Sequence, residues 1–159
     1  MTELLYKELT ATILRAYYDV YNGTGRVYPE HFYDRAMVHD LSAAGITCRP
    51  QPEHQVVFKQ KVVGKQILDI LIADEVIIED KVASSLTRLH KAQLLSYLKV
   101  VNKQIGLLFN FGGPKPEFQR LYFAPRELEV AKTQIARAAA DANISGLIEP
   151  QMVYEIVGG

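Results

Sequence analysis

The segment Lys65-Gln-Ile-Leu-Asp-Ile-Leu-Ile-Ala-Asp-Glu-Val-Ile-Ile-Glu-Asp-Lys-Val-Ala83 decides the fold, because it holds two apolar runs separated by a short polar loop. Such runs of Ile, Leu and Val around a three-residue loop are typical of a β-hairpin. A loop at 73–75 places Ile72 opposite Val76, and counting back along both strands places Asp69 opposite Glu79. The sequence therefore predicts an antiparallel pair with a carboxylate on each strand.

The charges that follow this pairing suggest a cation site. Side chains alternate between the faces of a strand, so Glu79 and Lys81 are expected to share a face while Asp80 points the other way. Directly opposed like charges destabilise a strand pair, and carboxylates among isoleucines are costly to bury without compensation. A divalent cation would compensate Asp69 and Glu79. The alternative is a pair of ordinary strand-end charges, with Lys81 as their ion-pair partner.

Length and charge place few limits on function. The 159 residues fit one domain, and the formal net charge is zero, so no overall field indicates a nucleic-acid partner. Residues 57–120 nevertheless hold ten Lys or Arg against six Asp or Glu, a local charge of +4. This surplus is compatible with a polyanionic substrate and also with an ordinary solvated face. Its cations include Lys59, Lys61, Lys65, Arg88, Lys91, Lys99 and Lys103.

The cysteine content and the first residues of the sequence indicate the expected cellular compartment. Cys48 is the single cysteine, so no internal disulfide is possible and a reducing compartment is expected. The first residues lack a basic region followed by a long apolar stretch, and no apolar run approaches the length of a membrane span. We expect a soluble cytoplasmic protein with no membrane partner.

The remaining elements follow from hydrophobic periodicity and from glycine and proline boundaries. Helices are expected at about 3–21, 29–44 and 87–101, and strands at 55–59, from about 62 or 65, in the hairpin, at 105–111 and at 118–123. The helix at 87–101 joins a strand to a later strand, which makes it a crossover. The prediction is an α/β (α+β) fold, in which a mixed central β-sheet is flanked by helices.

The composition changes after residue 125. Residues 126–140 are strong helix formers with an apolar stripe. We expect a domain over 1–124 and a C-terminal helical extension over 125–159 that packs on it as an appendage, with self-association as the alternative role.

Several segments, taken in order, match a known family. They are Gly23 to Gly25, Glu30-His-Phe-Tyr-Asp-Arg-Ala-Met37, Ile67-Leu-Asp-Ile-Leu-Ile72, Val76-Ile-Ile-Glu-Asp-Lys-Val82, His90-Lys-Ala-Gln-Leu-Leu-Ser-Tyr-Leu98 and Gly106-Leu-Leu-Phe-Asn-Phe-Gly112. Over about residues 4–123 this pattern resembles the GxxExxxY family, a small prokaryotic branch of the PD-(D/E)XK nuclease superfamily. The resemblance implies a restriction-endonuclease-like core.

The resemblance also implies the residues of an active site. In that site Asp69 and Glu79 bind the catalytic divalent ion, Lys81 assists the reaction, Glu30 adds a carboxylate, and Gln93 lies close by. Taken without the resemblance, Gln93 is a surface polar residue. The spacing from the glycines to Glu30 is longer here than in typical members of the family.

These residues suit phosphodiester hydrolysis. Hard oxygen ligands favour Mg²⁺ or Mn²⁺, which could be held by Asp69, Glu79 and the backbone carbonyl of Asp80. The ion would polarise the phosphate and lower the pKa of bound water, while Lys81 would orient the water or offset developing charge. The Asp80 side chain departs from the family pattern, because an apolar residue is usual at this position.

Two classes of function remain open. The first is a metal-dependent nuclease with a nucleic-acid partner, DNA in preference to RNA. The second is a catalytically inactive nucleic-acid-binding or protein-interaction module on the same fold. It stays open because a resemblance is stronger evidence for a fold than for a reaction. A homodimer is suggested by analogy with nucleases that cut both strands.

Overall fold

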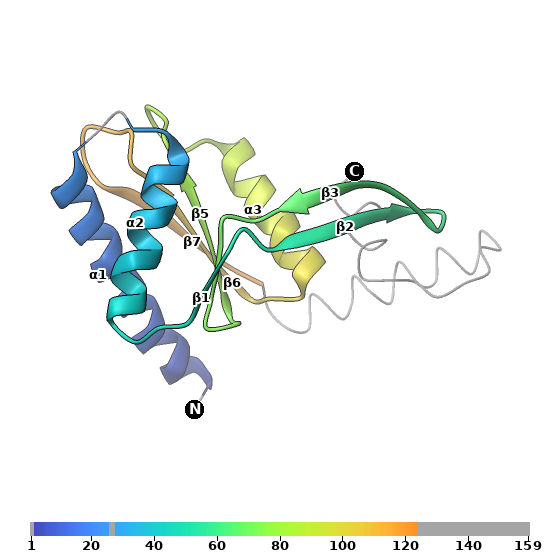
Figure 1. The fold of residues 1–159 in the computed structure, drawn as a ribbon, viewed down its shortest axis with the longest axis horizontal. Coiled ribbons are helices and arrows are strands. Elements are labelled where there is room, and N and C mark those ends of the chain that lie inside the picture. Colours follow the sequence, from blue (N-terminus) through green and yellow to red (C-terminus); the bar gives the residue numbers. More distant parts are fainter. Residues whose placement is uncertain (1, 26–27, 124–159) are drawn as a thin grey trace.

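Residues 2–25 and 28–123 are described by the computed structural model of the chain, so the expected extension at 125–159 lies outside the described residues. The elements in chain order are α1 (Thr2–Thr24), α2 (Glu30–Ala43), β1 (Cys48–Pro50), β2 (Glu53–Phe58), β3 (Lys61–Ile67), β4 (Ile70–Ile72), β5 (Val76–Lys81), α3 (Arg88–Val101), β6 (Ile105–Asn110) and β7 (Glu117–Tyr122) (Figure 1). No helix in this described part is long and apolar enough to cross a membrane.

Among the described residues, five strands form a mixed sheet in the order β1-β4-β5-β6-β7. β5 and β6 are parallel neighbours, and the other adjacent pairs are antiparallel. The parallel pair requires a crossover, which α3 provides. The structure confirms the mixed sheet flanked by helices, and it adds the short strand β1, which the sequence did not indicate.

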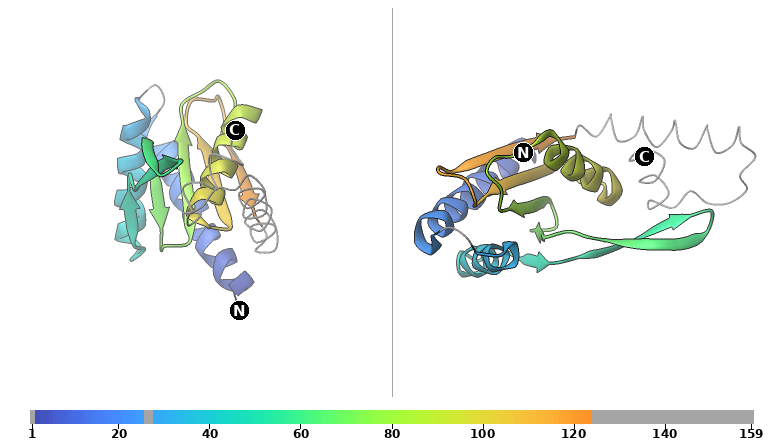
Figure 2. Two further views of the ribbon diagram at one scale, coloured as in Figure 1. Left: turned by 90° about the vertical axis from the view of Figure 1, so that its right-hand side faces the viewer. Right: turned by 90° about the horizontal axis from the view of Figure 1, so that it is seen from above.

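The helices cover opposite faces of this sheet (Figure 2). The core on one face joins α1 and α2 to alternate residues of the central strands, among them Ile13, Tyr17, Met37, Ile78 and Phe109. The core on the other face joins α3 to the residues between them, among them Ile77, Leu94, Leu98 and Leu108. Central strands buried on both faces explain why β5 and β6 are apolar almost without interruption.

The hairpin at the centre of the sequence has the predicted register. Ile72 pairs with Val76 and Ile70 pairs with Ile78. Ala73 and Asp74 in the loop adopt positive φ angles of 51° and 55°. The three-residue loop therefore closes the hairpin in the predicted register. Continuing that register by one residue beyond Ile70 and Ile78 places Asp69 opposite Glu79.

One strand expectation was wrong, since Asp69 does not lie within a strand. β3 ends at Ile67 and β4 begins at Ile70, and the chain bends between them. The backbone carbonyl of Asp69 accepts a hydrogen bond from the amide of Gln51 at 2.8 Å, so the bend is held by the segment between β1 and β2. Because of this bend β2 and β3 leave the main sheet and form a separate two-stranded ribbon.

The start of α3 shows how the chain after β5 is fixed. Thr87 accepts a hydrogen bond from the amide of His90 through its Oγ1, and His90 Nδ1 accepts one from the amide of Thr87. This reciprocal cap satisfies two amides that a helix start otherwise leaves unpaired. His90 therefore has a structural role at the helix terminus.

Candidate active site

Asp69 and Glu79 meet where the chain bends between β3 and β4. The amide of Asp69 donates to Glu79 Oε1 at 3.2 Å, and the amide of Asp80 donates to Asp69 Oδ2 at 2.7 Å. The two carboxyl groups also contact each other. Each carboxyl group thus accepts a hydrogen bond from a backbone amide of the other segment, and these two bonds hold the carboxyl groups side by side.

The site is strongly desolvated. Burial, and then the nearby charge of Asp34, raise the pKa of Asp69 to about 7. Burial, and then the charge of Asp69, raises the pKa of Glu79 well above its usual value, and this side chain is 4% exposed. Lys81 lowers both pKa values, so its cation lies close enough to compensate part of the charge. The remaining negative charge favours a proton or a cation at the site.

A second pair of carboxyl groups lies on the opposite face of β5. The Asp80 side chain contacts Asp34 of α2, and the two side chains are 0% and 9% exposed. Within the described residues no amide or hydroxyl donor reaches either oxygen of Asp80 or Oδ1 of Asp34, so the proton that the two carboxyl groups can share is the one donor between them. Burial and then this contact raise the pKa of Asp80, and burial raises that of Asp34. These are costly groups, because each buried oxygen lacks an amide or hydroxyl donor that would offset its desolvation.

Asp34 is the residue that sequence reasoning missed. It lies four positions after Glu30, and this spacing places the two residues on the same side of α2. That spacing was the available signal, although only the packing of α2 against β5 brings Asp34 to Asp69 and Asp80. The structure therefore adds a carboxyl group next to the expected set.

Glu30 and Gln93, the other residues that the resemblance implies, are both exposed. Glu30 is exposed in the first turn of α2, and its charge raises the pKa values of Asp69 and Asp34. Gln93 is exposed on α3. The structure thus brings Asp69, Glu79 and Lys81 together, with Glu30 within electrostatic range.

The rim of the site contains a cavity of about 660 Å³. It opens between α2 and the segment that joins β1 to β2, and it is lined by His31, Asp34, Arg35, Val38, Pro50 and Gln51. The cavity therefore reaches one of the carboxyl groups beside Asp69, and it carries an imidazole and a guanidinium at the same place.

The end of β5 is anchored by one buried amide. Asn110 Oδ1 accepts hydrogen bonds from the amides of Ala83 and Gly112, both at 3.0 Å. Its Nδ2 donates to the carbonyl of Ala83 at 2.9 Å and to Glu117 Oε1 at 3.2 Å. The amide side chain uses its bonding capacity on the segment directly after Lys81. Asn110 therefore fixes the backbone that carries the candidate lysine.

The donors fit a hard divalent cation. Across the described residues no three His, Cys, Asp or Glu side chains converge as a preformed metal cluster. A pair of carboxylates is nevertheless the usual protein contribution to a Mg²⁺ ion, which keeps several waters. The side chains of Asp69 and Glu79 supply that pair. Cys48 lies elsewhere in the fold, so the site offers no thiolate ligand for a soft metal.

Comparison with known families agrees with this arrangement. A family model described as the PD-(D/E)XK nuclease superfamily matches residues 7–121, a span that contains every carboxylate discussed above. The chain belongs to the PD-(D/E)XK nuclease superfamily. This superfamily is typically nucleolytic and generally uses divalent metals. The match is to the superfamily, so membership of the GxxExxxY branch stays a prediction.

The chain was also compared with solved structures and with curated proteins. One solved structure, described as "Crystal structure of SSO0001", is similar at 19% identity with a TM-score of 0.45 over 67% of this chain. The chain spans 56% of that solved chain. Comparison with curated proteins found no match.

Proposed function

We propose that the protein is a metal-dependent nuclease that hydrolyses phosphodiester bonds at Asp69, Glu79 and Lys81. The observation that carries this proposal is the reciprocal pair of backbone hydrogen bonds, Asp69 N to Glu79 Oε1 and Asp80 N to Asp69 Oδ2. These bonds orient both carboxyl groups before any ligand arrives. An oriented pair of carboxyl groups, one buried and one half-buried, contributes little to stability but is well suited to hold a cation at a phosphate beside a lysine.

Each residue has a defined task in this proposal. Asp69 and Glu79 would hold Mg²⁺ or Mn²⁺, which when bound neutralises phosphate charge and lowers the pKa of a coordinated water. Lys81 contributes a positive charge on the same side, where it stabilises the negative charge that develops during phosphodiester cleavage. The amide of Asp80 keeps the Asp69 carboxylate from rotating away.

The test is a nuclease assay with and without metal. Purified protein is incubated with duplex DNA, single-stranded DNA and RNA in Mg²⁺, in Mn²⁺ and in EDTA. We expect metal-dependent cleavage of at least one substrate, reduced at least about 100-fold by Asp69→Ala and by Lys81→Met, since each removes a group that acts in the transition state. The matched control is Asp74→Asn, a carboxylate in the turn of the same hairpin with an 84% exposed side chain.

The alternative, a binding module without hydrolytic activity, gives a different pattern. It predicts intact substrates in every metal, together with nucleic-acid binding that Asp69→Ala and Lys81→Ala leave unchanged. That combination would refute the proposed nuclease. Cleavage that persists fully in Asp69→Ala would also refute it, because the activity would then arise elsewhere.

A further inference from the structure

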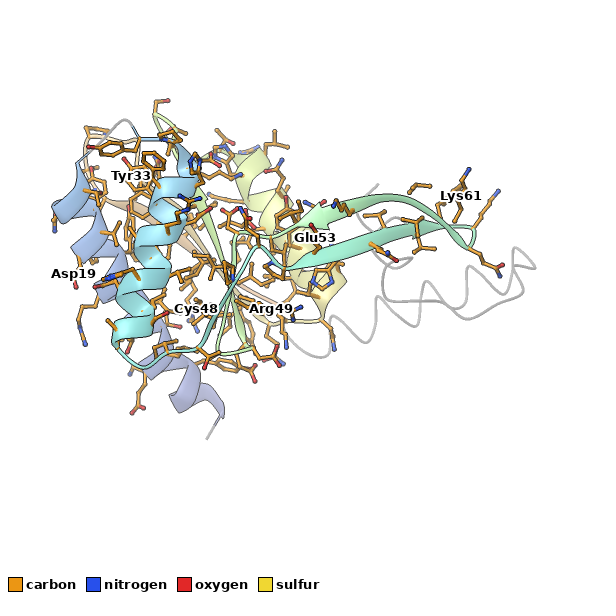
Figure 3. All side chains as sticks on the ribbon, in the orientation of Figure 1. Asp19, Tyr33, Cys48, Arg49, Glu53 and Lys61 are labelled. Carbon is orange, nitrogen blue, oxygen red and sulfur yellow. The ribbon has the colours of Figure 1, made fainter. Side chains whose placement is uncertain are left out.

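The ribbon formed by β2 and β3, residues 53–67, projects from the body of the protein as an arm (Figure 1). Six residue pairs join the strands, from Glu53 with Ile67 at the base to Phe58 with Lys61 at the tip. The two strands pair with each other and with none of the other strands described. At about 3.3 Å per residue the arm is about 20 Å long. Figure 3 shows Glu53 near the body and Lys61 at the far end.

The turn at the tip adopts a conformation that its residues disfavour. Lys59 and Gln60 form a two-residue loop with φ angles of 47° and 66°. Two-residue hairpin loops with positive φ at both positions strongly prefer Asn-Gly, because other side chains are strained there. The chain instead presents a lysine and a long polar side chain at the exposed tip of the arm. The strained turn holds both side chains exposed at the tip, where a partner can contact them.

The charge and the exposed side chains of the arm indicate an anionic partner. Three lysines and one acid lie on it, a net charge of +2 in a chain whose total is zero. Lys65 is paired with Glu53 at 3.3 Å, whereas the ion pairs seen in the described residues involve neither Lys59 nor Lys61. Phe58, Val62 and Val63 are about half exposed between these cations. An isolated two-stranded hairpin is only marginally stable in water, so the arm gains from a bound partner.

The base of the arm is continuous with the active site. Ile67 ends β3 two residues before Asp69, and the Leu68 amide donates to the carbonyl of Pro52 at 3.1 Å where the two strands enter the body. Measured along the extended chain, the tip at Lys61 therefore lies at most about 26 Å from Asp69. That length corresponds to about 8 base pairs of B-form DNA. A nucleic acid that contacts the tip can therefore reach the carboxylates.

We propose that the arm binds in the major groove of duplex DNA, with the tip lysines Lys59 and Lys61 on the phosphates and the ribbon face that carries Val62 toward the base edges. The proposal rests on the proposed nuclease function, and it names the substrate class of that site. The B-DNA major groove admits a two-stranded β-ribbon and offers thymine methyl groups for apolar contact. The major groove of an A-form RNA duplex is too narrow for side chains to read. The arm thus selects duplex DNA over duplex RNA.

The first experiment measures binding without cleavage. Fluorescence anisotropy in EDTA compares a 30-base-pair DNA duplex with an RNA duplex of the same sequence, over a series of salt concentrations. Lys59→Glu/Lys61→Glu should weaken DNA binding about tenfold or more and lower the slope of log K against log salt by about two, because two phosphate contacts are lost. Lys7→Glu/Arg15→Glu is the matched control, since it makes the same charge change on exposed residues of α1 and should leave both quantities nearly unchanged.

The second experiment separates binding from folding of the arm. Lys59→Asn/Gln60→Gly supplies the residues that the turn prefers and removes the tip side chains. We expect a raised melting temperature together with weaker DNA binding. A purely structural arm would give the raised melting temperature with unchanged binding, which would overturn the proposal.

Other outcomes are equally decisive. DNA binding that the arm variants leave intact, equal and equally arm-dependent binding of the RNA duplex, or no DNA binding at all would each overturn the proposal. Sedimentation showing that the arm variants only dissociate a dimer would assign the arm to a second copy of the chain and would also overturn it. Metal-dependent cleavage with arm-independent binding refutes this inference alone, whereas arm-dependent binding without cleavage in any metal refutes only the proposed nuclease.

Discussion

Replacing Asp80 with asparagine should stabilise the metal-free protein. The fully buried Asp80 carboxyl contacts Asp34, and no amide or hydroxyl of the described residues donates to its two oxygens. An asparagine of nearly the same shape removes one acid from this pair, and its amide can donate to the Asp34 carboxylate. Hydrogen bonds to charged groups contribute about 2 kcal/mol, so Asp80→Asn should raise the free energy of unfolding by about that amount at pH 8.

The gain should depend on pH in a defined direction. Burial raises the pKa of Asp80 above its ordinary value of 3.8, so the folded protein holds a proton that the unfolded chain has released. A raised carboxyl pKa therefore lowers stability as pH rises from about 4 through the folded-state pKa. The substitution removes this loss, which means that its benefit is largest at pH 8 and shrinks toward pH 4, where the unfolded chain also carries the proton.

The assay is thermal unfolding in EDTA at several pH values. For a chain of this size 2 kcal/mol corresponds to a melting temperature raised by about 4 to 8 °C. Asp74→Asn provides the exposed control and should change the melting temperature by less than about 2 °C. An Asp80→Asn melting temperature at pH 8 that is unchanged or lower would show that this carboxyl group is compensated in the folded protein, and the reasoning would fail.

Three further changes follow from the same contacts. Saturating Mg²⁺ at pH 8 should stabilise the wild type by about 2.7 kcal/mol at 100 times its dissociation constant, and differential scanning fluorimetry should show no such shift in Asp69→Ala; an equal shift would place the ion elsewhere. Asn110→Ala should cost about 3 kcal/mol in urea unfolding, because it leaves the backbone of Ala83 and the amide of Gly112 without their partner; a loss under 1 kcal/mol would contradict this. Gly112→Ala should cost about 2 kcal/mol or more, since its Cβ would lie 2.6 Å from the Ala83 backbone nitrogen, whereas a Cβ at Gly106 meets the Leu94 side chain at 2.9 Å and no backbone atom, so Gly106→Ala should cost less; the reverse order of unfolding midpoints would refute the steric argument.

Local patterns in the sequence determined much of the structure. The two apolar runs and their three-residue loop set the register of β4 and β5, because strand side chains alternate with a period of two and the loop fixes the starting pair. The boundaries of two helices are also local: Thr87 caps the start of α3, and Gly45, with a φ of 81°, follows the end of α2. Each of these features depends on residues within a few positions of one another.

The arrangement of the site depended on both the local sequence pattern and the tertiary packing. Alternation along β5 separated Asp80 from Glu79 and Lys81, and the hairpin register put Asp69 beside Glu79. Alternation along a strand does not predict which helix covers which face of the sheet. The residue that packs against Asp80 could therefore not be predicted from the sequence. The packing of α2 against β5 supplied Asp34, a residue 46 positions away in the chain.

The sequence by itself thus determined the hairpin, its facing carboxylates and the succession of helices and strands. Only the tertiary structure decided that the chain bends at Asp69, that β2 and β3 leave the sheet as an arm, and that Asn110 anchors the segment after Lys81. The physical reason is that periodicity and turn chemistry act over a few residues. Bends, arms and buried polar contacts are instead set by which distant backbone groups must find partners, such as the Gln51 amide at the Asp69 carbonyl.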